Sequence, residues 1–144
     1  LKMFELWLLR HGQSTGNARG VSQGAADGLT MKGRSQASSV RLPGPFARCY
    51  VSSMRRARET AQIVGAGLDF QVCELLREKE PGELQGAPHG SYRKAAQQAG
   101  DLRGYRPAGG ESWEDVMHRA AQFLLLVIQI ASCAGGDPSA TVGA

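Results

Sequence analysis

An apolar run, MFELWLL at residues 3–9, ends in three residues of very different chemistry: Arg10, His11 and Gly12. An imidazole can act as a nucleophile or as a proton acceptor near neutral pH. A guanidinium beside it can hold an anionic group through two parallel hydrogen bonds. Glycine lets the chain turn sharply and lets a ligand approach the backbone amides. Taken alone, this triplet is more typical of a solvated strand end, so its meaning depends on what the chain brings next to it.

Two further charged residues lie at corresponding points of the sequence. Arg56 follows the apolar segment 47–52, within VSSMRRARETA, and Glu78 follows the apolar segment 70–75, within LLREKEPGELQG. Open α/β sheets bind ligands just beyond the carboxyl ends of their strands, so we expect these side chains to meet. The set suits phosphoryl transfer: arginines neutralise phosphate oxygens, the imidazole attacks phosphorus, and a carboxylic acid protonates the leaving oxygen.

The elements that must position these residues alternate between strand and helix. Short apolar runs predict three strands, at 3–9, 47–52 and 70–75. Three- and four-residue apolar spacing, together with capping residues and helix-ending glycines and prolines, predicts helices at 31–42, 53–67, 91–99 and 113–131. This order is typical of an α/β domain, and we expect three layers: a mostly parallel sheet flanked by helices.

The two ends of the chain suggest a fragment with a loose tail. The chain begins at Leu1 rather than Met, which suggests a piece of a longer protein. The small, polar stretch 132–144, SCAGGDPSATVGA, predicts a disordered tail after a domain at 1–131. The most apolar stretch, FLLLVIQIA at 123–131, is well short of the roughly 18 apolar residues that indicate a membrane span, so none is expected.

The composition favours a small anionic partner. The 144 residues include 17 Lys and Arg against 13 Asp and Glu, and most of the basic residues are arginines, which suit phosphate groups. We therefore expect a small phosphorylated metabolite, and not a nucleic acid, because no basic run is interleaved with aromatic residues. Three widely spaced cysteines fit reduced thiols and a cytoplasmic location. No compact Cys/His cluster indicates a metal site, and the sequence indicates no oligomeric state.

Six segments taken together resemble the histidine phosphatase superfamily, the phosphoglycerate-mutase-like proteins. In chain order they are LLRHGQSTGN, SQG, GLTMKGRSQA, VSSMRRARETAQIV, LLRE and PAGGES, and the resemblance covers residues 3 to about 128. One match would be weak, whereas six in the family's order are specific. Within the superfamily the chain is most similar to the TIGAR-type fructose-2,6-bisphosphatases, in the stretch from LLREKEPGELQGAP to AGDLRGYRPAGGESWEDVMHR.

This resemblance implies a phosphatase that hydrolyses a small sugar bisphosphate, such as fructose-2,6-bisphosphate, through a phosphohistidine. His11 would be the residue phosphorylated, and Glu78 would be the proton donor. The phosphate and substrate contacts that the resemblance adds are Arg10, Asn17, Gln23, Gly24 and Arg56. The arginines would grip the transferred phosphoryl group, the asparagine would add a hydrogen bond, and the Gln-Gly pair would line the substrate side. No metal or other cofactor is implied, because the arginines take the role of a cation.

One part of the family pattern has no counterpart here. Family members carry a second catalytic histidine in a late strand followed by HG, and this chain ends about where that strand would begin. The remaining histidines, His89 and His118, follow no apolar strand run, and we expect both at the surface. Pro81 also stands where the family commonly has an aromatic residue. We therefore expect impaired turnover.

Two other interpretations stay open. One is a non-catalytic phosphate-binding relative that acts through interactions. The other is a phosphoglycerate mutase, which is less favoured because the middle segment lacks the basic substrate contacts of that branch.

Overall fold

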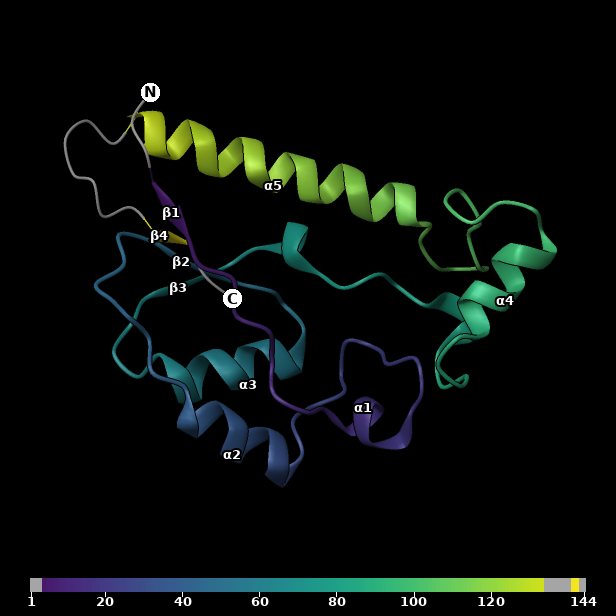
Figure 1. Ribbon diagram of the computed structural model, residues 1–144, viewed down its shortest axis with the longest axis horizontal. Helices are drawn as coiled ribbons and strands as arrows, with labels where there is room; N and C mark the ends of the chain where they lie inside the picture. Colours follow the sequence, from purple (N-terminus) through teal and green to yellow (C-terminus); the bar gives the residue numbers. More distant parts are fainter. Residues whose placement is uncertain (1–3, 134–140, 143–144) are drawn as a thin grey trace.

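Two pairs of parallel strands lie side by side at the centre of the fold (Figure 1). The computed structural model describes residues 4–133 and 141–142. In it, β1 (Glu5–Leu6) pairs with β4 (Thr141–Val142), and β2 (Cys49–Val51) pairs with β3 (Phe70–Val72). The second pair places Cys49 opposite Phe70 and Val51 opposite Val72, and β4 lies next to β2.

Helices cover both faces of these strands. The long helix α5 (Trp113–Cys133) crosses one face, while α2 (Met31–Ser39) and α3 (Arg55–Val64) pack together on the other (Figure 1). The short helices α1 (Thr15–Arg19) and α4 (Ser91–Gln98) lie beyond one end of the strands. Two single-turn 3₁₀ helices, Glu74–Leu76 and Gly82–Leu84, interrupt the connection between β3 and α4. The predicted fold class, an α/β protein with a parallel sheet between helical layers, is confirmed.

The buried core joins β2 to α5. Tyr50 from β2 packs edge-on against Phe123 from α5, with ring centroids 5.7 Å apart and an interplanar angle of 88°. Val127, one helical turn further along α5, completes the buried cluster. Edge-to-face packing of this kind adds about 1 kcal/mol to the burial of the two rings.

The face of α5 that is buried differs from the one that the spacing predicted. The three- and four-residue spacing predicted an apolar stripe of seven residues: Trp113, Val116, Met117, Ala120, Leu124, Val127 and Ile128. Val127 is buried as expected, yet Trp113, Met117, Leu124 and Ile128 are between 47% and 57% exposed, and the other buried residue, Phe123, lies outside the stripe. The segment 123–131 is apolar on nearly every side, so periodicity alone cannot select the face that meets the sheet. By length and composition α5 is also apolar enough to cross a membrane, with a mean hydropathy of 1.4, although it packs part of this surface into the core.

The strands are shorter than predicted, most clearly in the first one. The prediction of a buried strand over 3–9 is wrong in its extent: among residues 4–9, only Glu5 and Leu6 are paired, and Trp7 and Leu8 are 46% and 76% exposed. Within the described residues, the pairing of β1 is limited to the two positions opposite Thr141 and Val142.

Helix starts were predicted more accurately than helix ends. Thr30 caps α2 as expected, because its hydroxyl oxygen accepts a hydrogen bond from the Gly33 amide at 3.0 Å. The helix ends at Ser39 rather than at residue 42, before the proline-containing connector. The predicted tail, 132–144, lies mainly outside the described residues. Its first two residues continue α5, and residues 141–142 form β4.

Candidate active site

Gly12 brings the turn after β1 into direct contact with α2. A side chain at Gly12 would collide with the backbone of Gly33, and a side chain at Gly33 would collide with the backbone of Gln13. The two glycines therefore let the segment that carries His11 lie directly against α2. This close packing, rather than a sharp turn, is the reason that glycine follows the histidine.

The ring of His11 is held in one orientation by its own backbone neighbour and by Arg56. The Nδ1 atom lies 2.7 Å from the Gly12 carbonyl oxygen, and because a carbonyl can only accept, Nδ1 must carry the proton. The other ring nitrogen, Nε2, then presents a lone pair and accepts a hydrogen bond from Arg56 Nε at 3.2 Å. Nε2 is therefore the ring nitrogen that keeps a lone pair.

The surroundings of His11 keep the imidazole neutral. Burial is the largest cause that lowers its pKa, and the charges of Arg56 and Arg10 lower it further. The Gly12 carbonyl and the Glu78 carboxylate oppose this change without reversing it. A neutral ring at neutral pH retains the lone pair that attack on phosphorus requires.

We expect His11 to titrate below the ordinary histidine value of 6.5, and the folded chain to lose stability as the pH falls below that value. The unfolded chain takes up a proton at His11 that the folded chain binds less readily, so acid favours unfolding. Two-dimensional NMR of the imidazole protons measures the pKa directly. Arg56→Gln removes one charge that lowers this pKa and should raise it. A His11 pKa above 6.5 in the wild type would contradict the buried, cation-flanked site.

Arg56 is the buried centre of the polar network. Its side chain is 1% exposed, and each of its three nitrogen atoms donates a hydrogen bond. Besides His11 Nε2, the acceptors are the Gly24 carbonyl at 2.8 Å and Glu78 Oε2 at 2.5 Å. The first turn of α3 supplies this residue directly after β2. The structure thus brings Arg56, His11 and Glu78 together, as the strand-end pattern predicted.

Thr60 is a positioning residue that sequence reasoning missed. Its hydroxyl donates to the Arg56 carbonyl at 2.8 Å and accepts from the Gly12 amide at 3.2 Å. It therefore ties the turn that carries the imidazole to the helix that carries the guanidinium. Its position one turn after Arg56 in α3 was the available sequence signal.

Replacing Arg56 with methionine should weaken phosphate binding at least about tenfold, since each hydrogen bond to a charged group contributes about 1.5–3 kcal/mol. The same change should lower the free energy of unfolding by about 2 kcal/mol, because it leaves the Gly24 carbonyl and Glu78 without their donors. Calorimetric titration with phosphate or vanadate, and urea unfolding, measure the two effects. Arg58→Met, on an exposed position of the same helix, is the matched control. Equal anion affinity in the two variants would argue against the site.

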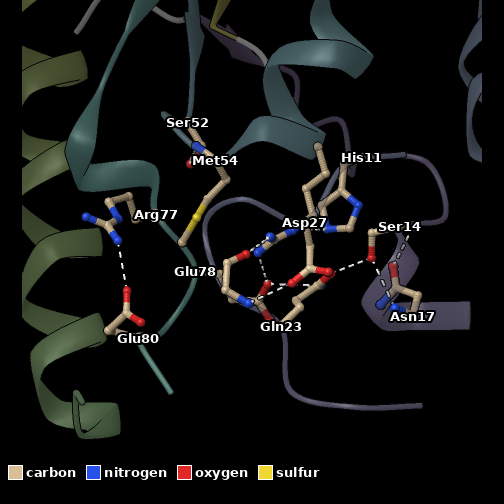
Figure 2. A network of polar contacts seen from close by, with 12 residues as sticks. His11, Ser14, Asn17, Gln23, Asp27, Ser52, Met54, Arg77, Glu78 and Glu80 are labelled. Atoms are coloured by element: carbon tan, nitrogen blue, oxygen red, sulfur yellow. Dashed lines mark hydrogen bonds and ion pairs between the residues drawn. The ribbon is translucent and has the colours of Figure 1, made fainter. Parts of the chain in front are cut away.

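A second set of polar contacts holds Glu78 from the side of α1. Gln23 donates through Nε2 to Glu78 Oε2 at 3.4 Å, and its Oε1 accepts from the Ser14 hydroxyl (Figure 2). Ser14 also caps α1 in a reciprocal arrangement with Asn17, whose Oδ1 accepts from the Ser14 amide at 3.1 Å. The cap occupies the oxygen of Asn17, so its amide nitrogen is the group that can donate to a ligand.

The loop that carries Glu78 is also fastened to α5. Arg119 donates to the Arg77 carbonyl at 2.8 Å and to both oxygens of Glu111, and Glu111 accepts from the Glu80 amide at 2.9 Å. The pair of Glu111 and Arg119 therefore fixes the backbone on both sides of Glu78, with Arg119 holding Arg77 and Glu111 holding Glu80. This explains why a motif outside the cavity accompanies the site.

Five of the seven predicted site residues line one cavity of about 470 Å³: Arg10, His11, Asn17, Gln23 and Glu78. The other two, Gly24 and Arg56, are buried and are not among the lining residues. They are joined by the hydrogen bond from Arg56 to the Gly24 carbonyl. The Arg10 side chain is exposed and has no hydrogen bond or ion pair within residues 4–133. No group of three His, Cys, Asp or Glu within the described part of the chain is placed to hold a metal ion.

Several lining residues were not predicted as site residues, among them the polar and aromatic side chains of Lys79, His89, Tyr92 and Trp113. His89 is exposed, as expected, but it also lines the cavity, with Nε2 donating to the Val21 carbonyl at 2.9 Å. His118 is exposed on α5 and is not a lining residue. Lys79 directly follows Glu78 in the sequence, and that position was the signal available for it.

Known proteins share both the sequence pattern and the fold. The family model for the histidine phosphatase superfamily (branch 1) matches residues 6–135. Fructose-2,6-bisphosphatase TIGAR B of Danio rerio is 33% identical over 138 residues, which are 88% of this chain and 54% of that protein. Adenosylcobalamin/alpha-ribazole phosphatase of Salmonella typhimurium is 29% identical over 139 residues, 89% of this chain and 69% of that protein.

A solved structure gives the same result for the fold. The phosphoglycerate mutase of Thermus thermophilus superposes with a TM-score of 0.72 at 30% identity, over 96% of this chain and 75% of that one. The chain spans about half the length of the zebrafish relative. With the family model covering most of its length, the chain belongs to the histidine phosphatase superfamily.

Proposed function

We propose that this chain acts on a small sugar phosphate, of the fructose-2,6-bisphosphate type, as a phosphatase that forms a phosphohistidine at His11. The observation that carries the proposal is the orientation of the imidazole. The Gly12 carbonyl fixes the proton on Nδ1, and Nε2 faces Arg56 and the cavity. We also propose a cytoplasmic location, on the cysteine content.

The residues present support a two-step reaction. In the first step Nε2 of His11 attacks phosphorus, the bond from phosphorus to the ester oxygen breaks, and the carboxylic acid of Glu78 protonates the leaving alcohol. In the second step water attacks phosphorus, the bond from phosphorus to Nε2 breaks, Glu78 takes up the proton of the water and so becomes the carboxylic acid again, and inorganic phosphate leaves. Arg10 and Arg56 would neutralise the phosphoryl oxygens in both steps.

The ion pair between Arg56 and Glu78 fits this scheme. Glu78 Oε2 occupies the Nη2 donor of Arg56, although the glutamate side chain is 54% exposed. A phosphoryl oxygen at the same donor would compete with the carboxylate and release it toward the leaving group. Binding of the anion and freeing of the acid would then be one event.

The substrate proposal draws on the relatives and on the size of the site. The similar proteins are named as a fructose-2,6-bisphosphatase and as an adenosylcobalamin/alpha-ribazole phosphatase, so both names describe enzymes that act on phosphate groups. A cavity of about 470 Å³ suits a ligand of this size. Either substrate would place its phosphate among Arg10, Arg56 and Asn17.

Two measurements on the purified chain test the proposal. Release of inorganic phosphate is followed for fructose-2,6-bisphosphate and alpha-ribazole phosphate. In parallel, the reaction is quenched in base, which preserves phosphohistidine. Peptide mass spectrometry then locates the phosphoryl group on the protein, which serves as the label. We expect label on the peptide that contains His11. Label on another residue, or phosphate release with none on His11 at any time, would overturn the mechanism.

The same measurements separate the two alternatives. A non-catalytic phosphate-binding relative would bind phosphate and show neither label nor release. This non-catalytic alternative is supported by the presence of a single suitable histidine. Of the three histidines in the chain, only His11 accepts a hydrogen bond from Arg56. A phosphoglycerate mutase would interconvert 2- and 3-phosphoglycerate with little release of phosphate.

A further inference from the structure

Lys79 is the one lysine in the wall of the cavity that holds His11, among the residues that the structure describes. Its Nζ atom lies 3.3 Å from the centre of the Tyr92 ring and 5.7 Å from that of Trp113. Within the described residues it has no hydrogen bond or ion pair with any carboxylate. Its nearest acidic neighbours are Glu78 and Glu111, whose charges act on it from outside ion-pair distance.

The aromatic platform under Lys79 is itself fixed. The Tyr92 hydroxyl donates to the Tyr105 carbonyl at 2.7 Å, and the Tyr92 and Trp113 rings meet edge-on with centroids 6.1 Å apart. The platform combines residues of α4 and α5, whereas Arg10 and His11 follow β1. A cation on two ring faces is held by their π electrons while its N–H groups stay free to donate.

We propose that Lys79 binds a second anionic group of the substrate, the one that is not transferred. This proposal rests on the proposed function, in which the transferred phosphoryl group occupies His11, Arg10 and Arg56. The substrate class is then a sugar-sized phosphate ester that carries a further phosphate or carboxylate. A phosphate ester of an uncharged alcohol would leave the Lys79 ammonium without an anionic partner when it is bound.

The surroundings of Lys79 are those of an anion-binding lysine rather than of a solvated one. Burial lowers its pKa, so the ammonium is already partly stripped of water. A partly desolvated cation gains more from an anionic partner than an exposed one, because the partner replaces little water. The other cavity cation with no partner among residues 4–133 is Arg10. The cavity therefore offers two separate cationic positions for two anionic groups.

Calorimetric titration with three probes tests the proposal. Inorganic phosphate reports the site at His11. The pair 6-phosphogluconate and glucitol 6-phosphate shares a six-carbon chain and a phosphate, and differs in a carboxylate against a hydroxymethyl group at the far end. We expect the wild type to prefer the carboxylate by about tenfold, the value of one charge-assisted hydrogen bond.

Variants assign that preference to one residue. Lys79→Met keeps the alkyl contact with Tyr92 and Trp113, and should abolish the preference while leaving the affinity for inorganic phosphate within about twofold. Lys79→Arg should retain the preference, and Lys94→Met, at an exposed position of α4, should behave as the wild type.

Every outcome of this experiment is informative. A preference that survives Lys79→Met, or a wild type that binds phosphate without preference, overturns this proposal and leaves the proposed function intact. An equal loss of affinity for all three probes in Lys79→Met assigns Lys79 to the first phosphate site and also overturns it. A wild type that does not bind inorganic phosphate rejects the proposed function, and this proposal with it.

Discussion

Replacing His11 with asparagine should abolish the phosphoryl label and lower the release of phosphate at least about 10³-fold, the scale on which loss of a catalytic nucleophile is felt. Asparagine is the informative substitution because its amide nitrogen can still donate to the Gly12 carbonyl, as Nδ1 of the imidazole does. The substitution removes Nε2 together with its lone pair. The turn against α2 and its contact with Thr60 should persist.

Two measurements distinguish a catalytic effect from a structural one. Urea unfolding should show His11→Asn within about 1 kcal/mol of the wild type, the usual size of a single neutral hydrogen bond. Calorimetry should still detect phosphate, since Arg10 and Arg56 are unchanged. His118→Asn, at an exposed position of α5, is the control and should keep both label and rate. Phosphate release by His11→Asn at the wild-type rate would place the nucleophile elsewhere.

The elements could be read from the sequence because local signals agree with the tertiary arrangement. Thr30 is followed by a helix that it caps, and Gly65 ends the helix that carries Arg56. The extent of β1 could not be read, because MFELWLL is almost uniformly apolar while strand length depends on its partner. The same reason explains the misassigned face of α5, where apolar residues surround the helix axis.

The convergence of His11, Arg56 and Glu78 was predictable from the topology. Arg56 and Glu78 follow β2 and β3, and strands that run in parallel end at one edge. The positioning contacts were less accessible. Thr60 acts through a helix turn, and Arg119 acts from α5 on a loop more than forty residues away in sequence. Only the spacing of Thr60 one helical turn after Arg56 is a local signal, and nothing local marks the contact of Arg119.

The part of the cavity wall formed by Lys79, Tyr92 and Trp113 was missed for a related reason. Lys79, Tyr92 and Trp113 come from a loop and from two helices, and each residue type alone is ordinary in sequence. Only their contact makes a cation held on two rings. No single motif contains this cluster, because its three residues come from segments that are distant in sequence.

The overall rate of the reaction should be low in this 144-residue chain. Turnover of fructose-2,6-bisphosphate should be at least about a hundredfold below that of the zebrafish TIGAR B relative, because one positioned electrostatic group contributes about 10²–10³ in rate. The chain has three histidines, and its second cavity histidine, His89, already donates Nε2–H to a backbone carbonyl. No second imidazole of the described residues is therefore oriented on the phosphoryl group as in the family pattern.

Chemical rescue tests this explanation of the rate. Added imidazole should raise phosphate release by this chain in proportion to its concentration, by placing a ring where the family pattern has its late histidine. His89→Gln should leave both the basal rate and the rescue unchanged, since this proposal gives His89 no role in the transfer. A relative that carries the late histidine of the family pattern should not respond to imidazole. Equal turnover of the two proteins, lost on His89→Gln, would instead show that His89 serves as the second imidazole, and the expected deficit would be wrong.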